Sequence, residues 1–216
     1  PSVLVGDFLH SRAFEMMVDI GNIRVMEILS KATNVIAEGE VQQLSFIRNP
    51  ATTEVEYMEI ITRKTAMLFQ AAAQAGAVLA GANEETEHAL RDYGLHLGIA
   101  FQMVDDQLDY LGTPEELGKN IGDDLAEGKV TLPLIIAMRN GQPEQKAFVE
   151  NAIRNGGVEN LPEMIQLVKA TDALKYTFEQ ANTERCEAMA CLSNVADSEF
   201  RDSMSTLINF VVDRHH

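Results

Sequence analysis

Apolar residues recur every three or four positions along nearly the whole chain, and this spacing restricts the fold more than any other feature of the sequence. Alternating apolar and polar runs bounded by turn residues, which would indicate strands, are hard to find. The spacing predicts helices at about 2–19, 23–47, 53–80, 84–111, 131–140, 143–154, 161–181, 183–193 and 198–213. The predicted fold class is therefore all-α, a bundle of long helices around a central cavity.

The length of the chain favours one domain. A compact chain of 216 residues buries roughly 70% of the surface that its unfolded form exposes, which is enough for one large core. No stretch holds the roughly 20 uninterrupted apolar residues of a membrane span, and no signal segment is recognisable. We therefore expect a cytoplasmic protein with a single domain over residues 1–216 and no stable membrane insertion.

The charge balance excludes one class of partner. The chain has 17 basic and 33 acidic residues, for a net charge of −16, which disfavours the phosphate backbone of a nucleic acid. An anionic ligand would need a metal ion as mediator. The two cysteines, Cys186 and Cys191, lack the neighbouring cysteines and histidines of a zinc site, so we expect two reduced structural thiols.

The segment FQMVDDQLDY, from Phe101 to Tyr110, places acidic residues in a helix that otherwise reads as buried. Gln102, Asp105, Asp106 and Asp109 share one helix face, because each residue advances about 100°. Three crowded carboxylates repel one another unless a cation neutralises them, and Mg²⁺ shared with a diphosphate suits such oxygens. A solvated acidic face explains the spacing equally well. The alternating ligands and central glycine of an EF-hand are absent.

Lysines near these aspartates favour an anionic ligand. The longest irregular segment, 112–130, carries Lys119 and Lys129 between glycines, and a long loop in a compact domain is commonly functional. Upstream, Lys64 lies inside the apolar run IITRKTAMLFQAAA, where a lysine usually extends its ammonium group to solvent. Three lysines and three aspartates together indicate a site better than any one of them does.

Several ordered blocks of the sequence resemble those of the trans-isoprenyl diphosphate synthases. These blocks are VLVGDFL from Val3, GEVQQL from Gly39, RKTAMLF from Arg63, and FQMVDDQLDY from Phe101 followed by LGKNIGDDLAEGKVTLPL from Leu117. The last pair resembles the second aspartate-rich motif and the lysine loop of that family. The resemblance is strongest to long-chain bacterial polyprenyl synthases of the octaprenyl diphosphate synthase type.

The resemblance implies an isoprenoid synthase fold and a prenyltransferase of isoprenoid biosynthesis. Such an enzyme condenses an allylic diphosphate, for example farnesyl diphosphate, with isopentenyl diphosphate, uses Mg²⁺ and forms a homodimer. Carried over by position, the metal residues are Asp105, Asp106 and Asp109, with Asp105 the most direct ligand, and the catalytic residues are Lys64, Thr65, Gln102, Lys119 and Lys129. Glu40, Gln42 and Gln43 match the family as residues of the cavity wall, whereas Asp7 is as readily a structural helix residue.

The chain also departs from the family pattern. A first aspartate-rich motif precedes the VLVGDFL block in this family, and the sequence does not contain it. Because Pro1 cannot be an initiator, we expect roughly the first third of the protein to be missing, so that residues 1–216 are the C-terminal two thirds of the domain. We expect this part alone to be inactive. Product length is not readable from it.

Other readings of the sequence stay open. Without the first motif, the protein could be a non-catalytic partner subunit, or a truncated fragment, that cannot ionise substrate alone. A helical interaction module with a solvated acidic face would require the three lysines to point in separate directions. A terpene cyclase also begins by ionising an allylic diphosphate, but the loop from Lys119 to Lys129 matches the condensing enzymes better.

Overall fold

The computed structural model describes residues 2–111 and 121–214, and this part of the chain is all-α, without strands, as predicted. Its helices are α1 (Ser2–Ile20), α2 (Ile23–Phe46), α3 (Glu54–Ile61), the π-helical turn η1 (Thr62–Ala66), α4 (Met67–Leu79), α5 (Glu84–Leu111), α7 (Asp123–Ala126), α8 (Leu132–Asn140), α9 (Pro143–Asn155), the 3₁₀ turn η2 (Val158–Asn160), α10 (Leu161–Ala170), α11 (Ala173–Leu192) and α12 (Glu199–Asp213). Among them, none is both long and apolar enough to cross a bilayer.

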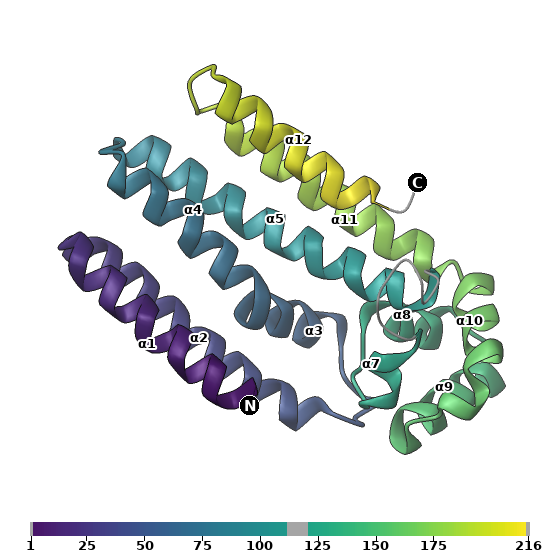
Figure 1. Ribbon diagram of the computed structural model, residues 1–216. Coiled ribbons are helices and arrows are strands. Elements are labelled where there is room, and N and C mark those ends of the chain that lie inside the picture. The colour runs from purple at the N-terminus through teal and green to yellow at the C-terminus, as the bar shows by residue number, and fades with distance from the viewer. Residues whose placement is uncertain (1, 112–120, 215–216) are drawn as a thin grey trace.

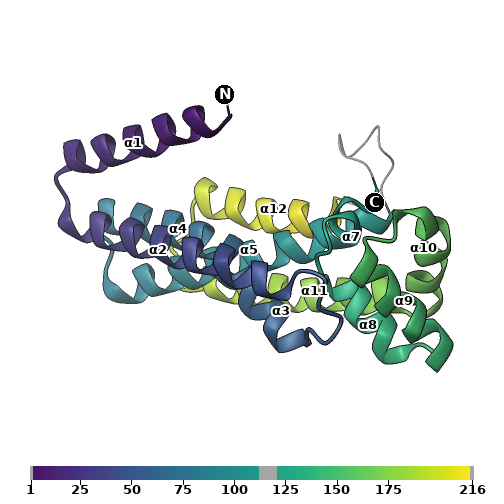
Figure 2. The ribbon, with the colours of Figure 1, turned by 90° about the horizontal axis from the view of Figure 1, so that it is seen from below.

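The longest helix, α5, is the centre of the bundle. It packs against α4 and α11, while α2 packs against α4 and α12 packs against α11. Figure 1 shows these long helices side by side, with α8, α9 and α10 gathered at one end. In Figure 2, α1 lies at the edge of the bundle, beyond α2. The predicted bundle of long helices is confirmed.

Two predicted helix boundaries near the C-terminus are wrong. The helix expected at 161–181 is interrupted, because Thr171 and Asp172 separate α10 from α11 and Asp172 has a φ of 55°. Asp172 is in the left-handed region, and a continuous right-handed helix does not pass through a residue in that conformation. The break expected at about residue 182 is absent, because Asn182 and Thr183 donate to carbonyls one turn earlier within α11.

Other local predictions are confirmed. At the start of α3, the Thr53 hydroxyl accepts from the Glu56 backbone N–H at 3.3 Å, and the Glu56 carboxylate accepts from the Thr53 N–H at 2.7 Å, which is a capping box. Cys186 and Cys191 are free thiols. The predicted irregular segment covers residues 112–130. Residues 112–120 lie outside the described residues, and residues 121–130 contain the short helix α7.

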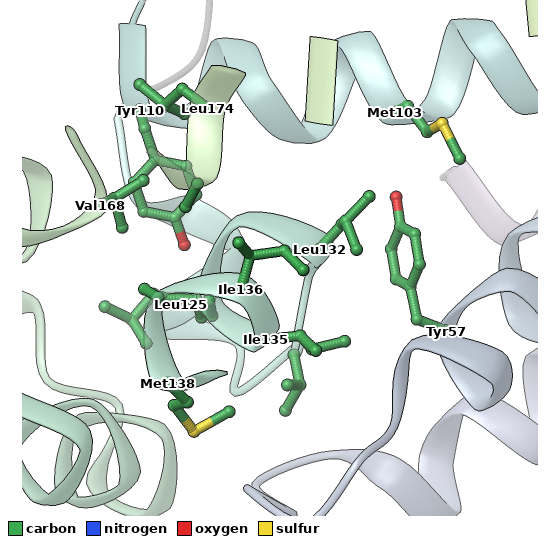
Figure 3. Close-up of a cluster of buried hydrophobic side chains, with 14 of the residues drawn as sticks. Tyr57, Met103, Tyr110, Leu125, Leu132, Ile135, Ile136, Met138, Val168 and Leu174 are labelled. Carbon is green, nitrogen blue, oxygen red and sulfur yellow. The ribbon is translucent and has the colours of Figure 1, made fainter. Parts of the chain in front are cut away.

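Most of the core surrounds α8, at the end of the bundle that also holds the acidic part of α5. Figure 3 shows apolar side chains of α8 meeting Met103 and Tyr110 from α5 and Tyr57 from α3. The α8 residues labelled there are Leu132, Ile135, Ile136 and Met138. Each such buried side chain stabilises the fold by about 1.5–3 kcal/mol. Burial of α8 therefore fixes the ends of α3 and α5 relative to each other.

The close contact between the π-helical turn η1 and α5 depends on a glycine. A Cβ atom at Gly98 would lie 2.5 Å from the Ala66 Cα atom, which is backbone and cannot rotate away. We expect Gly98→Ala to lower the free energy of unfolding by about 1–3 kcal/mol. The matched control is Gly76→Ala in α4, where no atom lies within 4 Å of the added Cβ. That change should raise stability by up to about 1 kcal/mol, because alanine is the better helix former. Urea denaturation checks both, and equal effects would contradict the packing argument.

The pair His96 and Glu184 joins α5 to α11 and makes stability depend on pH. The Nδ1 atom of His96 lies 2.7 Å from a Glu184 carboxylate oxygen. The hydrogen bond to Glu184 raises the pKa of His96 above its ordinary value of 6.5, against the opposing effect of burial. A raised pKa in the folded state means that the pair stabilises the fold fully below pH 6.5, and that this contribution is lost as the pH rises through the folded pKa.

We therefore expect Glu184→Gln to destabilise the protein at pH 5.5, by up to about 1 kcal/mol, and to have a smaller effect at pH 9. Urea denaturation of both proteins at the two pH values measures this difference. An equal effect at both would show that the charge of His96 does not contribute.

Candidate active site

Six of the eight predicted site residues line one cavity of about 300 Å³. The walls come from the end of α2, from α3 and η1, from α5, and from the segment that begins with α7. The predicted residues in its lining are Lys64, Thr65, Gln102, Asp105, Asp106 and Lys129. The structure thus brings together groups that are far apart in the sequence.

The π-helical turn η1 carries two of these residues. The Met67 N–H donates to the Thr62 carbonyl five residues earlier, instead of four as in an α-helix. The wider turn changes the angle between successive side chains, and both Lys64 and Thr65 line the cavity. The predicted helix 53–80 therefore contains a local irregularity of the kind that is frequent at functional sites.

Lys64 is held between η1 and α2. Its ammonium group donates to the Gln43 side-chain oxygen at 2.7 Å and lies 3.2 Å from the Glu40 carboxylate. The backbones of α2 and η1 also approach closely here: a Cβ atom at Gly39 would lie 3.0 Å from the backbone nitrogen of Lys64. Lys64 therefore presents a positive charge at the cavity and does not extend away from the bundle.

Asp106 is the most constrained acidic group of the site. One carboxylate oxygen accepts from the Tyr57 hydroxyl and the other from the Gln102 amide, each at 2.7 Å. Burial and the charge of Asp124 raise the pKa of Asp106 to about 8, although both hydrogen bonds oppose the shift. The charged form of Asp106 is thus disfavoured at this place, and a cation in the cavity would stabilise that form.

Lys129 supplies a second positive charge. Its ammonium group donates to Asp124 at 2.9 Å and lies 2.7 Å from the Glu127 carboxylate. Burial alone would lower the pKa of Lys129, but Glu127 and Asp124 raise it, so the side chain is charged at neutral pH. The neighbouring Gly128 carbonyl accepts from the Arg48 N–H at 2.7 Å, which ties this segment to the end of α2.

Among the predicted site residues that the structure describes, Asp109 is the one that does not line the cavity. Asp109 is completely buried one helical turn beyond Asp105, and its backbone carbonyl accepts from the Gly122 N–H at 3.1 Å. The segment that begins at Gly122 therefore covers α5 at this point. Lys119 lies outside the described residues. Of the weaker candidates, Gln43 lines the cavity, Glu40 contacts Lys64, and Asp7 is exposed on α1.

The arrangement fits a magnesium ion that is shared with a substrate. Within the ranges described, no group of three or more acidic, histidine or cysteine side chains is placed to hold a metal ion by itself. Asp105, however, is partly exposed and lines the same cavity as Lys64 and Lys129. Asp123, Asp124 and Glu127 line it as well. Carboxylates beside two lysines suit Mg²⁺, which keeps several waters and is commonly bound through substrate phosphates.

Comparison with known proteins agrees with this geometry. Residues 1–169 match the family described as polyprenyl synthetase. The chain belongs to this family. It is 47% identical over 214 residues to the octaprenyl diphosphate synthase of Escherichia coli (strain K12), an alignment that covers 99% of this chain and 66% of that protein. It is 44% identical to the all-trans-nonaprenyl-diphosphate synthase (geranyl-diphosphate specific) of Rhodobacter capsulatus, over 99% of this chain and 65% of the relative.

Solved structures of the polyprenyl synthetase family have the same fold. A polyprenyl synthase from Caulobacter crescentus CB15, complexed with calcium and isoprenyl diphosphate, superimposes with a TM-score of 0.95 at 45% identity. The match covers 100% of this chain and 66% of that one. The chain thus has the all-α isoprenoid synthase fold and spans about two thirds of the length of its relatives.

Tyr57 and Asp124 also line the cavity and were not predicted from the sequence. Tyr57 is seven residues before Lys64, two helical turns away, so it lies on the same side of its helix. That spacing could have identified it. Asp124 lies within the block LGKNIGDDLAEGKVTLPL. Its contact with Lys129 depends on the turn after α7, which the sequence pattern does not reveal.

Proposed function

We propose that the full-length protein is a polyprenyl diphosphate synthase. It condenses an allylic diphosphate, such as farnesyl diphosphate, with isopentenyl diphosphate in a Mg²⁺-dependent reaction that yields a longer polyprenyl diphosphate. The observation that carries this proposal is the cavity in which Lys64, Lys129 and Asp105 meet Thr65 and Gln102. Identity of 47% to an octaprenyl diphosphate synthase supports a long-chain product.

The chemistry follows from the charges in the cavity. The ammonium groups of Lys64 and Lys129 would neutralise the oxygens of the departing diphosphate. Mg²⁺, bound through Asp105 and the diphosphate, would supply further stabilisation of the same negative charge. Asp106 and Asp109 belong to the same proposed metal site, but they are buried in α5 and would act as supporting groups behind Asp105. Lys119, on the same lysine loop, is proposed as a third cation.

Thr65 and Gln102 would act on the positive charge that develops on the allylic carbon. When the diphosphate leaves, the allylic carbon becomes positive, and the oxygen atoms of these two side chains can stabilise it by their dipoles. The isopentenyl double bond then attacks the cation, and the product loses a proton. Water would capture the cation, so the apolar part of the wall, including Phe46, Ile60 and Ile61, has the role of excluding it.

Incubation of the full-length protein with radiolabelled isopentenyl diphosphate, farnesyl diphosphate and Mg²⁺ tests the proposal. We expect a labelled polyprenyl diphosphate that is absent when Mg²⁺ is chelated. No product at any Mg²⁺ concentration would contradict the proposal and favour the alternative of a non-catalytic partner subunit. The similarity to complete synthases does not favour that alternative.

The remaining proposals concern assembly and location. We propose a homodimer, as the resemblance to the trans-isoprenyl diphosphate synthases implies. Sedimentation of the full-length protein tests this state. We retain the predictions that residues 1–216 belong to a single isoprenoid synthase domain and that the protein is cytoplasmic.

A further inference from the structure

The hydroxyl group of Tyr57 is buried at the wall of the cavity. The tyrosine lies on α3, is 3% exposed, and donates to the Asp106 carboxylate at 2.7 Å. Removing this hydroxyl would leave a carboxylate oxygen of a 2% exposed residue without its donor. A buried polar group that loses its partner costs more free energy than the hydrogen bond itself contributed.

Tyr57 is one end of a connected series of hydrogen bonds. The second Asp106 oxygen accepts from the Gln102 amide nitrogen at 2.7 Å, and the Gln102 amide oxygen accepts from the Thr65 hydroxyl at 3.0 Å. In its charged form, which a cation in the cavity would favour, Asp106 has no proton to donate and accepts both bonds that it makes in this series. Gln102 must therefore turn its NH₂ group toward Asp106 and its oxygen toward Thr65.

We propose that Tyr57 is a positioning residue, which holds Asp106 so that Gln102 keeps its amide oxygen toward Thr65 and the cavity. This inference rests on the proposed function, because the orientation matters when positive charge develops on the substrate. The oxygen is the negative end of the amide dipole and stabilises a nearby cation. A reversed amide would present its NH₂ group and destabilise the same cation.

Two donors are needed to fix the Asp106 carboxylate. With Tyr57 and Gln102 each on one oxygen, the carboxylate plane is set by contacts to two different helices, α3 and α5. If the tyrosine hydroxyl is lost, the carboxylate can rotate and Gln102 loses a fixed partner. Networks of this kind contribute more than the sum of their separate bonds.

The kinetic test compares Tyr57→Phe with Tyr93→Phe in the full-length protein. Tyr93 is a matched control, because it is 2% exposed and donates to the Met204 carbonyl at 2.8 Å, outside the cavity. We expect Tyr57→Phe to lower kcat for prenyl transfer about tenfold with little change in KM for farnesyl diphosphate. Tyr93→Phe should leave kcat unchanged. Unchanged kcat in Tyr57→Phe would overturn the proposal.

A double-mutant cycle separates positioning from a general structural role. If Tyr57 acts through Gln102, then Tyr57→Phe should have no further effect on kcat when Gln102 is already alanine. An equal tenfold loss in that background would show that Tyr57 acts by another route, and would overturn the inference.

NMR of the Gln102 side-chain amide tests the positioning role without an activity assay, and so separates this inference from the proposed function. The ¹⁵N resonances of the Gln102 side-chain amide can be identified by their loss in Gln102→Ala. We expect them to shift and to exchange faster with solvent in Tyr57→Phe, but not in Tyr93→Phe. Unchanged resonances in Tyr57→Phe would overturn the positioning role, whereas an inactive wild-type protein would contradict only the proposed reaction.

Discussion

Replacing Asp105 with alanine in the full-length protein should lower kcat for prenyl transfer by at least about 100-fold. Asp105 is the acidic residue of FQMVDDQLDY that is partly exposed and lines the cavity. Asp106 already accepts hydrogen bonds from Tyr57 and Gln102, and Asp109 is completely buried. No neighbour in this helix can therefore replace the missing carboxylate toward Mg²⁺ and the diphosphate.

Steady-state assays over a range of Mg²⁺ concentrations measure this effect. The Mg²⁺ concentration for half-maximal activity should also rise, because a ligand is lost. Asp202→Ala is a suitable control, since Asp202 is exposed in the first turn of α12, away from the cavity. Wild-type turnover in the Asp105 variant would refute the metal role given to this residue.

The second large effect is expected for Lys64→Ala, which should reduce kcat/KM for the allylic diphosphate about 100-fold. The Lys64 ammonium group lines the cavity and is held there by Gln43 and Glu40. Its loss removes a positive charge that would neutralise part of the negative charge on the leaving diphosphate. Arginine should restore the activity only in part, because its planar group is larger and cannot occupy the same position.

A surface lysine provides the comparison for this measurement. Lys146 lies on α9 with its side chain 56% exposed, and Lys146→Ala should leave kcat/KM unchanged. Kinetic constants for farnesyl diphosphate are to be measured for Lys64→Ala, Lys64→Arg and the control. If Lys64→Ala retains the wild-type value, then the cavity does not bind the diphosphate through this residue.

Much of the fold could be predicted because helices are indicated by the spacing of apolar residues and by capping residues within a short segment. The capping box of Thr53 and Glu56 and the long helix that ends near residue 111 are such local features. The break at Thr171 and Asp172 was missed because both residues are compatible with a helix by spacing. The outcome there depends on how α10 and α11 pack against α8, which is a tertiary contact.

The candidate site likewise depends on tertiary contacts that the sequence pattern does not reveal. The sequence identified Lys64, Gln102 and Asp105, and the structure places all three at one cavity. It also predicted a shared face for Asp105, Asp106 and Asp109, which is correct for an isolated helix. The fold then covers Asp109 and ties Asp106 to Tyr57, so the three carboxylates differ in exposure and in hydrogen bonding.

By itself, the sequence determined the all-α class, the order of the helices and the family, because these depend on periodicity and on motifs within single segments. Only the tertiary structure decided which acidic groups line the cavity, how Tyr57 reaches Asp106, and where the π-helical turn lies. The physical reason is that exposure, hydrogen-bond partners and pKa are set by neighbours from other helices. Those neighbours are brought together by the burial of α8 and by the close packing of η1 on α5 at Gly98.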